Sequence, residues 1–496
     1  MRLIMILLLF GMWTFITGGC NSGDGGFGFI PTGRIVAVAE RDDSTEVHVG
    51  APRGSITPGR TVTVINTSTG ETKTATVEDD GSFKLEFSAS TDSIFRVVIE
   101  EEGIDETIGV SIIRDAVSRN LAQLGSVPTN IKIVGNRAYV LNGFSDNIQI
   151  FDLNQNPPQQ IGTITLPPGS DPVDIAFLDN THAYVVNMIG QSIAMVNLET
   201  RQCETIIVRL GMGDEFPPCS NVVLVASAFE DPSGIEIANG KLYVTNSNLD
   251  EFFEPSGNGF VTVIDTETNQ VIRTISTTGE NTGWITAVNG KLYVVNSGNV
   301  FFNPDTGEFN CDTESIPSID IIDPENDTLV DSIVIPLSEQ NPSVCLPGRM
   351  EPTPDGRFGY MGLGITGALL KVDLKNNTVV NGSENPIAIT PLSELNFTAD
   401  IKIRDDGLGF VTLFNSDQIA VIDTTTDEVN PFPFIFPFPA GLRADNPSSD
   451  FFDGVQNLAI RPGVSGRDFL GADIFFITGL SQKLGSVDTT LILPPE

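Results

Sequence analysis

Histidine is scarce in this chain, since His48 and His182 are the only two in 496 residues. This scarcity argues against hydrolases that use a catalytic histidine, against metal sites with several histidines and against haem proteins with two axial imidazoles. Cationic residues are also few, with 27 Lys+Arg against 64 Asp+Glu and a formal net charge of −37. Because nucleic-acid binding needs a cationic face, we predict that the protein binds no nucleic acid.

The chain begins with a pattern typical of export signals. The apolar run from Leu3 to Ile16 is short for a membrane span and has the length of a signal-peptide core. Residues 17–20, Thr-Gly-Gly-Cys, resemble the lipobox of bacterial lipoproteins, although threonine stands where leucine is usual. The resemblance implies that residues 1–19 are removed and that acyl chains on Cys20 anchor the mature protein to a membrane. The alternative is an ordinary secretory signal with a chance cysteine.

Asn21 follows the cysteine and resembles the pattern that sorts lipoproteins to an outer membrane. Residues 20–29 are rich in glycine, which is typical of a flexible tether. We therefore expect a lipid-anchored protein of the bacterial envelope, in the outer membrane. A chain this acidic is repelled by anionic lipid and depends on an acyl anchor to stay at a bilayer.

Four cysteines remain after Cys20, and disulfides are the usual state of cysteines in exported proteins. We predict that they pair in sequence order, Cys203 with Cys219 and Cys311 with Cys345. The alternative is a metal site with four thiolates, but no Cys-x-x-Cys spacing supports it. The absence of Cys-x-x-Cys-His excludes covalent c-type haem.

Residues 30–115 contain short runs of alternating apolar residues, such as Val62 to Ile65 and Phe83 to Phe87, separated by turn signals. This pattern predicts a small antiparallel β-sandwich. The stretch from Pro58 to Phe87 resembles bacterial immunoglobulin-like modules. The resemblance implies a spacer or an adhesive module.

A repeat occupies residues 116–496, and every tyrosine in the chain stands at one position of it. The tyrosines are Tyr139, Tyr184, Tyr243, Tyr293 and Tyr360, and Phe410 and Phe475 take the sixth and seventh places. Four copies read Tyr-Val-x-Asn, and an alternating run that ends in Asp or Asn follows in each copy. The recurring Asn and Asp residues are expected to close turns at strand ends rather than to bind a ligand.

The repeat resembles the YVTN family of bacterial β-propellers. The resemblance implies an all-β fold, a seven-bladed β-propeller preceded by the small immunoglobulin-like sandwich. A single four-stranded blade cannot bury its two apolar faces, whereas a closed ring of blades buries them all. Copies five to seven depart from the pattern, with Leu363, Leu413 and Thr478 in place of asparagine. Either residues 484–493 or the returning residues 116–124 are expected to close the ring.

The inner strand of each copy should border a central channel, and the residue before its apolar anchor should face that channel. This position holds Asn130, Asp174, Gly234, Trp284, Arg349, Asp400 and Asn457. The position after the anchor includes Glu351 and Lys402, which we expect to pair between neighbouring blades. Charges at such positions indicate a hydrated channel, because unpaired charges are costly in a dry core.

Asp174, Trp284, Arg349 and Asp400 are the candidate ligand-binding residues at the mouth of the channel. Trp284 offers a stacking surface, and Arg349 offers a clamp for an anion. The alternative is a hydrated channel that holds no ligand.

Three further features each lead to a prediction. The acidic loops 250–254 and 303–312 offer oxygen ligands for Ca²⁺, but neither has EF-hand spacing, and solvated loops are the alternative. No other cofactor is predicted. The segment Pro431–Pro439 alternates proline with apolar residues and is either a docking or membrane-dipping surface or a loop over the blade seams. His182 is expected in a surface turn.

These observations favour a monomeric, non-catalytic envelope protein whose propeller binds an unknown protein or a small molecule. An enzyme is the alternative, because YVTN-like propellers resemble lactonases, quinoprotein dehydrogenase subunits and the haem domain of nitrite reductase. Carboxylate chemistry at Asp174 or Asp400, or a Ca²⁺-assisted lactonase, would suit the scarcity of histidine. A structural surface-layer or adhesion protein is the third hypothesis.

Overall fold

The computed structural model describes residues 35–489 apart from fourteen short gaps. The gaps are 40–44, 52–55, 79–80, 82, 101–102, 113–116, 211–215, 227–228, 251–253, 304–307, 393–395, 431–437, 440–452 and 463–471. The predicted signal peptide, Cys20 and the tether lie outside the described residues. In the part of the chain that is described, no helix is long and apolar enough to cross a membrane. The elements are strands almost throughout, so the prediction of an all-β fold is confirmed.

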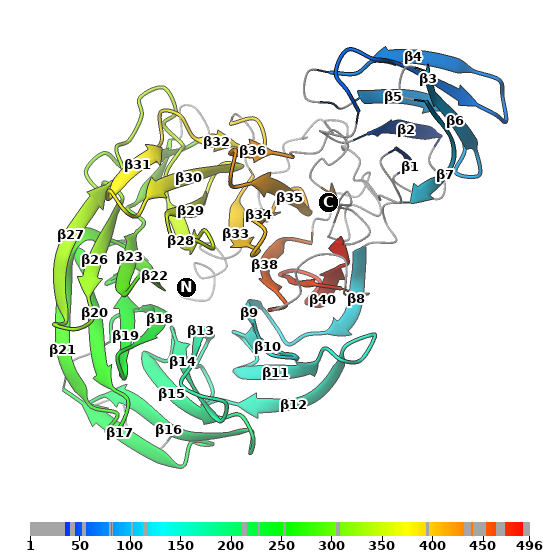
Figure 1. Ribbon diagram of the computed structural model, residues 1–496. Coiled ribbons are helices and arrows are strands. Elements are labelled where there is room, and N and C mark those ends of the chain that lie inside the picture. Colours follow the sequence, from blue (N-terminus) through cyan, green and yellow to red (C-terminus); the bar gives the residue numbers. More distant parts are fainter. Residues whose placement is uncertain are drawn as a thin grey trace.

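The N-terminal strands form one seven-stranded sheet with the order β4-β3-β6-β7-β1-β2-β5, which lies outside the ring of the other sheets (Figure 1). Its strands are β1 (Val36–Ala39), β2 (Glu46–Ala51), β3 (Thr61–Asn66), β4 (Thr72–Thr76), β5 (Phe83–Ser88), β6 (Ile94–Ile99) and β7 (Ile104–Ile112). The predicted runs Val62 to Ile65 and Phe83 to Phe87 lie in β3 and β5. Their alternate side chains, with Phe95, fill the core of this sheet. The expectation of a wholly antiparallel arrangement was wrong at one pair, because β1 runs parallel to β7.

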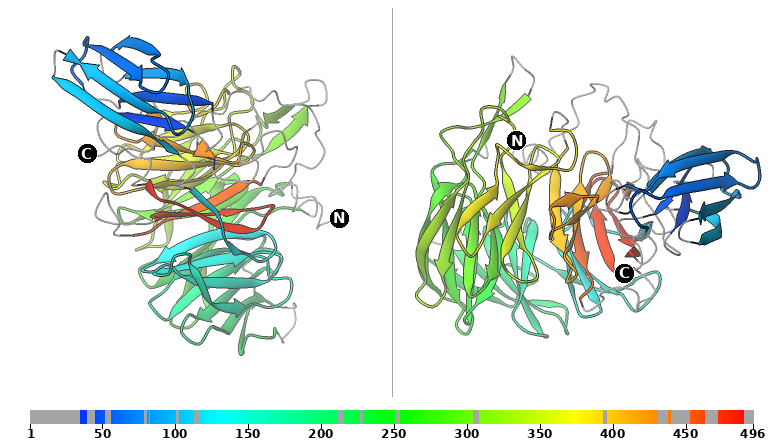
Figure 2. Two further views of the ribbon diagram at one scale, coloured as in Figure 1. Left: turned by 90° about the vertical axis from the view of Figure 1, so that its right-hand side faces the viewer. Right: turned by 45° about the horizontal axis from the view of Figure 1, so that its top comes forward.

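The remaining described residues build successive sheets around a ring, which we number 1 to 7 in chain order (Figures 1 and 2). Sheet 1 comprises β9 (Pro128–Val134), β10 (Arg137–Asn142), β11 (Asn147–Asp152) and β12 (Gln159–Thr165). Sheet 2 comprises β13 (Pro172–Phe177), β14 (His182–Asn187), β15 (Ser192–Asn197), β16 (Gln202–Arg209) and β17 (Asn221–Val225). Sheet 3 comprises β18 (Pro232–Ala238), β19 (Lys241–Asn246), β20 (Asn258–Asp265) and β21 (Val271–Glu280).

Sheets 4 to 7 continue the same antiparallel order. Sheet 4 comprises β22 (Thr282–Val288), β23 (Lys291–Asn296), β26 (Ser318–Asp323) and β27 (Thr328–Val334), and β24 (Val300–Asn303) pairs separately with β25 (Glu308–Cys311). Sheet 5 comprises β28 (Pro347–Pro352), β29 (Phe358–Leu363), β30 (Ala368–Asp373), β31 (Thr378–Asn381) and β32 (Ile387–Ala388). Sheet 6 comprises β33 (Thr398–Ile403), β34 (Leu408–Leu413), β35 (Gln418–Asp423), β36 (Glu428–Val429) and β37 (Phe438–Pro439). Sheet 7 comprises β38 (Val455–Ile460), β39 (Ile474–Thr478), β40 (Lys483–Val487) and β8 (Val117–Gln123).

The ring is closed by a strand from the N-terminal side of the repeat. β8 pairs antiparallel with β40, so residues at opposite ends of the repeat share sheet 7. The side chains of Gln123 and Lys483 add a hydrogen bond of 2.6 Å across this pair. The inner strand of each sheet contacts that of the next, and β38 contacts β9. Of the two closures left open by the sequence, the structure therefore has the one made by the returning N-terminal residues.

The tyrosines of the repeat join neighbouring sheets. In four of the five, the buried ring ends in a hydroxyl that donates to the turn after the third strand of the next sheet. These bonds run from Tyr184 to the Thr266 carbonyl (3.2 Å) and Asn269 Oδ1 (2.6 Å), from Tyr243 to the Pro324 carbonyl (3.2 Å) and Asp327 Oδ1 (2.5 Å), from Tyr293 to the Leu374 carbonyl (3.2 Å), and from Tyr360 to the Thr424 carbonyl (3.0 Å) and Asp427 Oδ1. A phenol at this position thus fills the apolar space between two sheets and satisfies polar groups of the second.

The recurring Asn and Asp residues close turns, as predicted. Asp265 Oδ1 accepts the backbone N–H groups of Glu267 (3.1 Å) and Thr268 (2.8 Å) just after β20. Asn197 makes the same kind of turn at the end of β15. In the Tyr-Val-x-Asn motif, Asn246 Nδ2 donates to the Val244 carbonyl and to Thr262 Oγ1 of the adjacent strand. These side chains are occupied by local structure.

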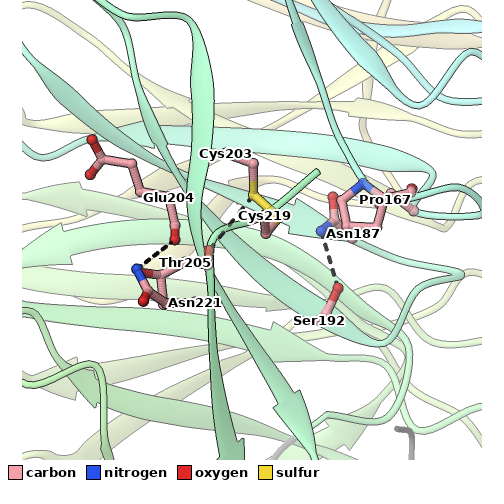
Figure 3. Close-up of a disulfide and its surroundings, with 9 residues drawn as sticks. Pro167, Asn187, Ser192, Cys203, Glu204, Thr205, Cys219 and Asn221 are labelled. Atoms are coloured by element: carbon pink, nitrogen blue, oxygen red, sulfur yellow. Dashed lines mark hydrogen bonds between the residues drawn. A yellow bond between two sulfur atoms is a disulfide. The ribbon is translucent and has the colours of Figure 1, made fainter. Parts of the chain in front are cut away.

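Two disulfides hold segments that lie next to the sheets. Cys203 in β16 is bonded to Cys219 in the loop before β17, with the Cα atoms 4.5 Å apart (Figure 3). Cys311 at the end of β25 is bonded to Cys345, with the Cα atoms 5.9 Å apart. This is the pairing in sequence order, and it leaves no thiolate of these four for the alternative metal site. Beside the first disulfide, Asn221 Nδ2 donates to the Glu204 carbonyl at 3.0 Å, which helps to seat β17 parallel to β16 (Figure 3).

The link from tyrosine to the next sheet can be tested with Tyr243→Phe. The change removes a hydrogen bond to a carboxylate that is 13% exposed. Hydrogen bonds to charged groups contribute about 1.5–3 kcal/mol, so the free energy of unfolding should fall by that amount. Urea denaturation measures it. Tyr139→Phe is the matched control, because no hydrogen bond of the Tyr139 hydroxyl occurs among the described residues. Equal losses in the two variants would contradict the role of the hydroxyl.

Candidate functional site

The predicted channel residues lie on inner strands of four different sheets. Asp174 is in β13 of sheet 2, Trp284 in β22 of sheet 4, Arg349 in β28 of sheet 5 and Asp400 in β33 of sheet 6. Arg349 Nη2 forms an ion pair with Asp174 Oδ2, which joins two sheets that are not neighbours. The Arg349 guanidinium also lies over the Trp284 ring, 5.0 Å from its centroid. Three of the four residues therefore meet.

Asp174 is completely buried, and both of its carboxylate oxygens are occupied. Oδ1 accepts from Asn130 Nδ2 (3.1 Å), Lys132 Nζ (2.9 Å) and its neighbour Ile175 N (2.9 Å). Oδ2 accepts from Ile235 N (3.2 Å) in sheet 3 and from Arg349. Burial on its own would raise the pKa of this carboxyl, but Arg349 and Lys132 hold the pKa below its ordinary value. Asp174 is therefore ionised and has no oxygen free for a ligand.

Asp400 repeats this arrangement in sheet 6. Its Oδ1 accepts from Ile401 N (3.0 Å) and from Lys402 Nζ (2.7 Å), and its Oδ2 accepts from Leu458 N (3.2 Å) in sheet 7. In both aspartates, one oxygen binds the following N–H of its own strand and the other binds the anchor N–H of the next sheet. The shared geometry joins the inner strands of neighbouring sheets.

The expected contact between Glu351 and Lys402 is present, with 3.6 Å between Oε2 and Nζ. Burial raises the pKa of Glu351, and Lys402 opposes that shift only in part. Burial lowers the pKa of Lys402, but Asp400 and Glu351 outweigh it and leave the pKa raised. Lys402 is thus a cation shared by two carboxyl groups on adjacent sheets.

A pocket of about 220 Å³ opens beside this pair, between sheets 5, 6 and 7. The charged residues on its wall are Glu351, Lys402, Arg404, Asp405 and Arg461. None of the four predicted mouth residues lines it. Two of the residues before the anchors, Asp174 and Asp400, are used to join the sheets. The ligand site predicted at Asp174, Trp284, Arg349 and Asp400 stays a prediction.

Arg404 and Arg461 were missed by sequence reasoning. Both stand three residues after the anchor of their inner strand, and only the last two copies of the repeat have arginine there. Arg404 donates to Asp473 (2.9 Å) in sheet 7. Arg461 donates to Asn136 (2.6 Å) in sheet 1. An alignment of the copies would have marked the two arginines as unusual, although their partners lie in other copies.

The other predicted features are a histidine and three segments of the chain. His182 is the first residue of β14 rather than part of a turn, and its ring nitrogens lie 3.6 Å from Asp179 and 3.3 Å from Glu204. The acidic loops 250–254 and 303–312 lie partly outside the described residues, as does most of Pro431–Pro439. The predictions for these segments stay predictions.

Comparison with known proteins bears on the fold. Hydrazine synthase of Kuenenia stuttgartiensis is similar in structure, with a TM-score of 0.52 at 14% identity, over 75% of this chain and 97% of that chain. This chain contains a β-propeller. U3-55K (TM-score 0.49, 10% identity, 75% and 98% of the two chains) and the computationally designed Ika8 protein (0.43, 10%, 74% and 99%) are also similar. No family model and no curated protein matches the chain. Likeness at this identity carries no function.

The ion pair across the propeller channel gives a prediction for Asp174→Asn. The variant leaves Arg349 and Lys132 without their buried counter-charge, which should lower the free energy of unfolding by about 3–5 kcal/mol at neutral pH. The folded pKa of Asp174 is depressed below 3.8, so its stabilising contribution is present above that pH and is lost as the pH falls through the folded value. Urea denaturation should therefore show a large difference from the wild type at pH 7 and a smaller one at pH 3.

The exposed carboxylate Glu199 supplies the control. Glu199→Gln removes the same charge from the surface and should change stability by less than about 0.5 kcal/mol. A difference between wild type and Asp174→Asn that does not change with pH would show that the carboxylate charge is not the stabilising element.

Proposed function

We propose that this chain is an exported, lipid-anchored protein of the bacterial envelope whose seven-bladed propeller is a non-catalytic scaffold for a partner or a small ligand. In this proposal, residues 116–496 form the propeller and residues 30–115 form an immunoglobulin-like stalk. Residues 20–29 are the tether left after removal of the signal peptide 1–19. Sheets 1 to 7 and the resemblance of the repeat to YVTN propellers support the blade count.

The non-catalytic function is supported by one observation: the carboxylate oxygens of Asp174 and Asp400 already accept hydrogen bonds. A general base or nucleophile needs a lone pair that can reach the substrate. Asp174 is fully buried among donors from three other sheets, and Asp400 is bound by Lys402 and two backbone N–H groups. The groups that looked most suited to carboxylate chemistry hold the propeller together.

A binding function is supported by three features on neighbouring sheets. Trp284 lies in sheet 4, Arg349 lies in sheet 5, and the pocket lies between sheets 5, 6 and 7. Trp284 is only partly buried, and Arg349 keeps 18% of its side chain exposed. The pocket beside Glu351 is smaller than a typical site for a drug-sized ligand, which spans about 300–1,000 Å³. These features suit a small polar molecule or a single side chain of a protein partner.

Glu351 favours a second candidate, an enzyme of the lactonase type. It lines the pocket, and burial raises its pKa, which is the environment that lets a carboxyl act as a general acid near neutral pH. Glu351 also differs from the aspartates because its contact with Lys402 is long.

The fluorescence of Trp284 distinguishes the two candidates, because the other tryptophan, Trp13, lies in the predicted signal peptide. The compounds to be tested are Ca²⁺, sugars, lactones and quinone cofactors. We expect one of these classes to cause a saturable change in fluorescence. For a non-catalytic protein, the compound should be recovered unchanged afterwards. Arg349→Lys should weaken the response, whereas Arg357→Lys, the same change at an exposed arginine, should not. Ring-opened lactone that disappears in Glu351→Gln would contradict the non-catalytic function and support the enzyme.

The anchor is tested separately by Cys20→Ser in a bacterial host. Each buried methylene of an acyl chain contributes about 0.8 kcal/mol, so two or more chains hold a protein stably at a bilayer. The wild type should sediment with membranes and partition into detergent, whereas the variant should stay in the aqueous fraction. Membrane association that survives the substitution would mean that the chain is held in another way.

A further inference from the structure

A group of possible metal ligands lies in the N-terminal sheet, far along the chain from the channel. Glu46 and His48 are alternate residues of β2, and Glu86 of β5 stands directly opposite His48 in the antiparallel register. The three side chains therefore share one face of the sheet. This is the face opposite the apolar core, to which Val47, Val49 and Phe87 belong.

The ligand atoms converge. His48 Nε2 lies 3.7 Å from Glu46 Oε1, and His48 Nδ1 lies 3.5 Å from Glu86 Oε1. One ligand atom from each residue can be chosen so that all three lie within 4.8 Å of one another. Bonds of about 2.0–2.2 Å to a tetrahedral ion place ligand atoms about 3.3–3.6 Å apart. The two glutamates lie nearest to different ring nitrogens, and one ion can bind only one of these nitrogens. Both glutamates are exposed, so one side chain can turn toward the nitrogen that the other already approaches.

We propose that Glu46, His48 and Glu86 bind a divalent transition-metal ion, with Zn²⁺ as the best match to one imidazole and two carboxylates. One ring nitrogen and two carboxylate oxygens supply three protein ligands, and solvent can complete the coordination. Imidazole selects such an ion over Ca²⁺ and Mg²⁺, which take oxygen ligands.

The imidazole is buried beside two carboxylates. His48 is 3% exposed although it lies on the outer face of the sheet. Two carboxylates beside the ring carry negative charge that a dication would neutralise.

Lys84 competes for this charge. Its Nζ lies 3.2 Å from Glu86 Oε1, and it stands two residues before Glu86 on the same face of β5. A bound dication would take over one partner of this lysine. Replacing Lys84 by an uncharged residue should accordingly favour the metal.

His182 provides an internal comparison. It too has two carboxylates near its ring, from Asp179 and Glu204, but it is 29% exposed. Among the described residues, the group around His48 is the only one in which three ligand atoms come this close together. Each histidine thus has two carboxylates as neighbours. Only around His48 do three possible ligand atoms come this close together, and only His48 is buried.

The test titrates the purified full-length protein with Zn²⁺ by isothermal calorimetry, with excess Ca²⁺ and Mg²⁺ present to occupy the acidic surface. We expect one tight site. Loss of an outer-shell partner costs about 10- to 100-fold in affinity, so loss of a ligand in His48→Ala should weaken binding by at least about tenfold. Glu86→Gln should weaken it as well, Lys84→Met should strengthen it, and His182→Ala should leave it unchanged.

A spectroscopic readout separates ligation from folding. With Cu²⁺ as the probe, electron paramagnetic resonance should show nitrogen coupling in the wild type and in His182→Ala, but not in His48→Ala. Glu86 is exposed, and glutamine has nearly the same shape as glutamate. Glu86→Gln therefore tests the site even if His48→Ala fails to fold. Equal Zn²⁺ affinity in the wild type, His48→Ala and Glu86→Gln would overturn the proposal. So would a wild type whose Zn²⁺ binding is abolished by Ca²⁺.

Discussion

The contact between each sheet and the next is the constraint on which the propeller depends. A four-stranded antiparallel sheet has two apolar faces, and here the cores of the described residues lie between one sheet and the next. The tyrosine hydroxyls make this contact directional, because each of the four that donates reaches one turn of the following sheet. Closure adds the last contact through β8 and β40, which are distant in sequence and adjacent in space. Each sheet of the ring therefore depends on its neighbours for its packing.

The same constraint explains the chemistry of the channel. Inner strands crowd together at the axis, so charged residues there need a nearby counter-charge. Asp174 is neutralised by Lys132 and Arg349 of two other sheets. Asp400 is neutralised by Lys402 of its own strand, which also contacts Glu351 of the neighbouring sheet. A carboxylate used in this way is buried, and both of its oxygens already accept hydrogen bonds, so it is poorly suited to act as a base. Glu351 is the exception, because burial raises its pKa and its 3.6 Å contact with Lys402 offsets that shift only in part.

The sequence predicts what repeats and leaves open what links one copy to another. Tyr243 and Asn246 recur at fixed spacing, so the strands around them could be placed from the pattern alone. The partner of the Tyr243 hydroxyl, Asp327, lies in the next copy, and no spacing reveals that bond. Arg461 likewise reaches Asn136 at the far end of the repeat. Channel residues could be identified by alignment, but their pairing depends on which sheets face each other across the axis.

The placement of the cations links the fold to the proposed location. The chain has 27 Lys+Arg against 64 Asp+Glu, and several of the cations stand in the ring, where they neutralise channel carboxylates or donate to neighbouring sheets. Cations used there cannot also form a basic patch for anionic lipid on the surface. Charge then works against attachment to a bilayer, and a hydrophobic anchor is the remaining means of holding such a protein at one. The proposed acyl anchor at Cys20 would complement an acidic propeller, since it would supply the attraction to a bilayer that the propeller lacks.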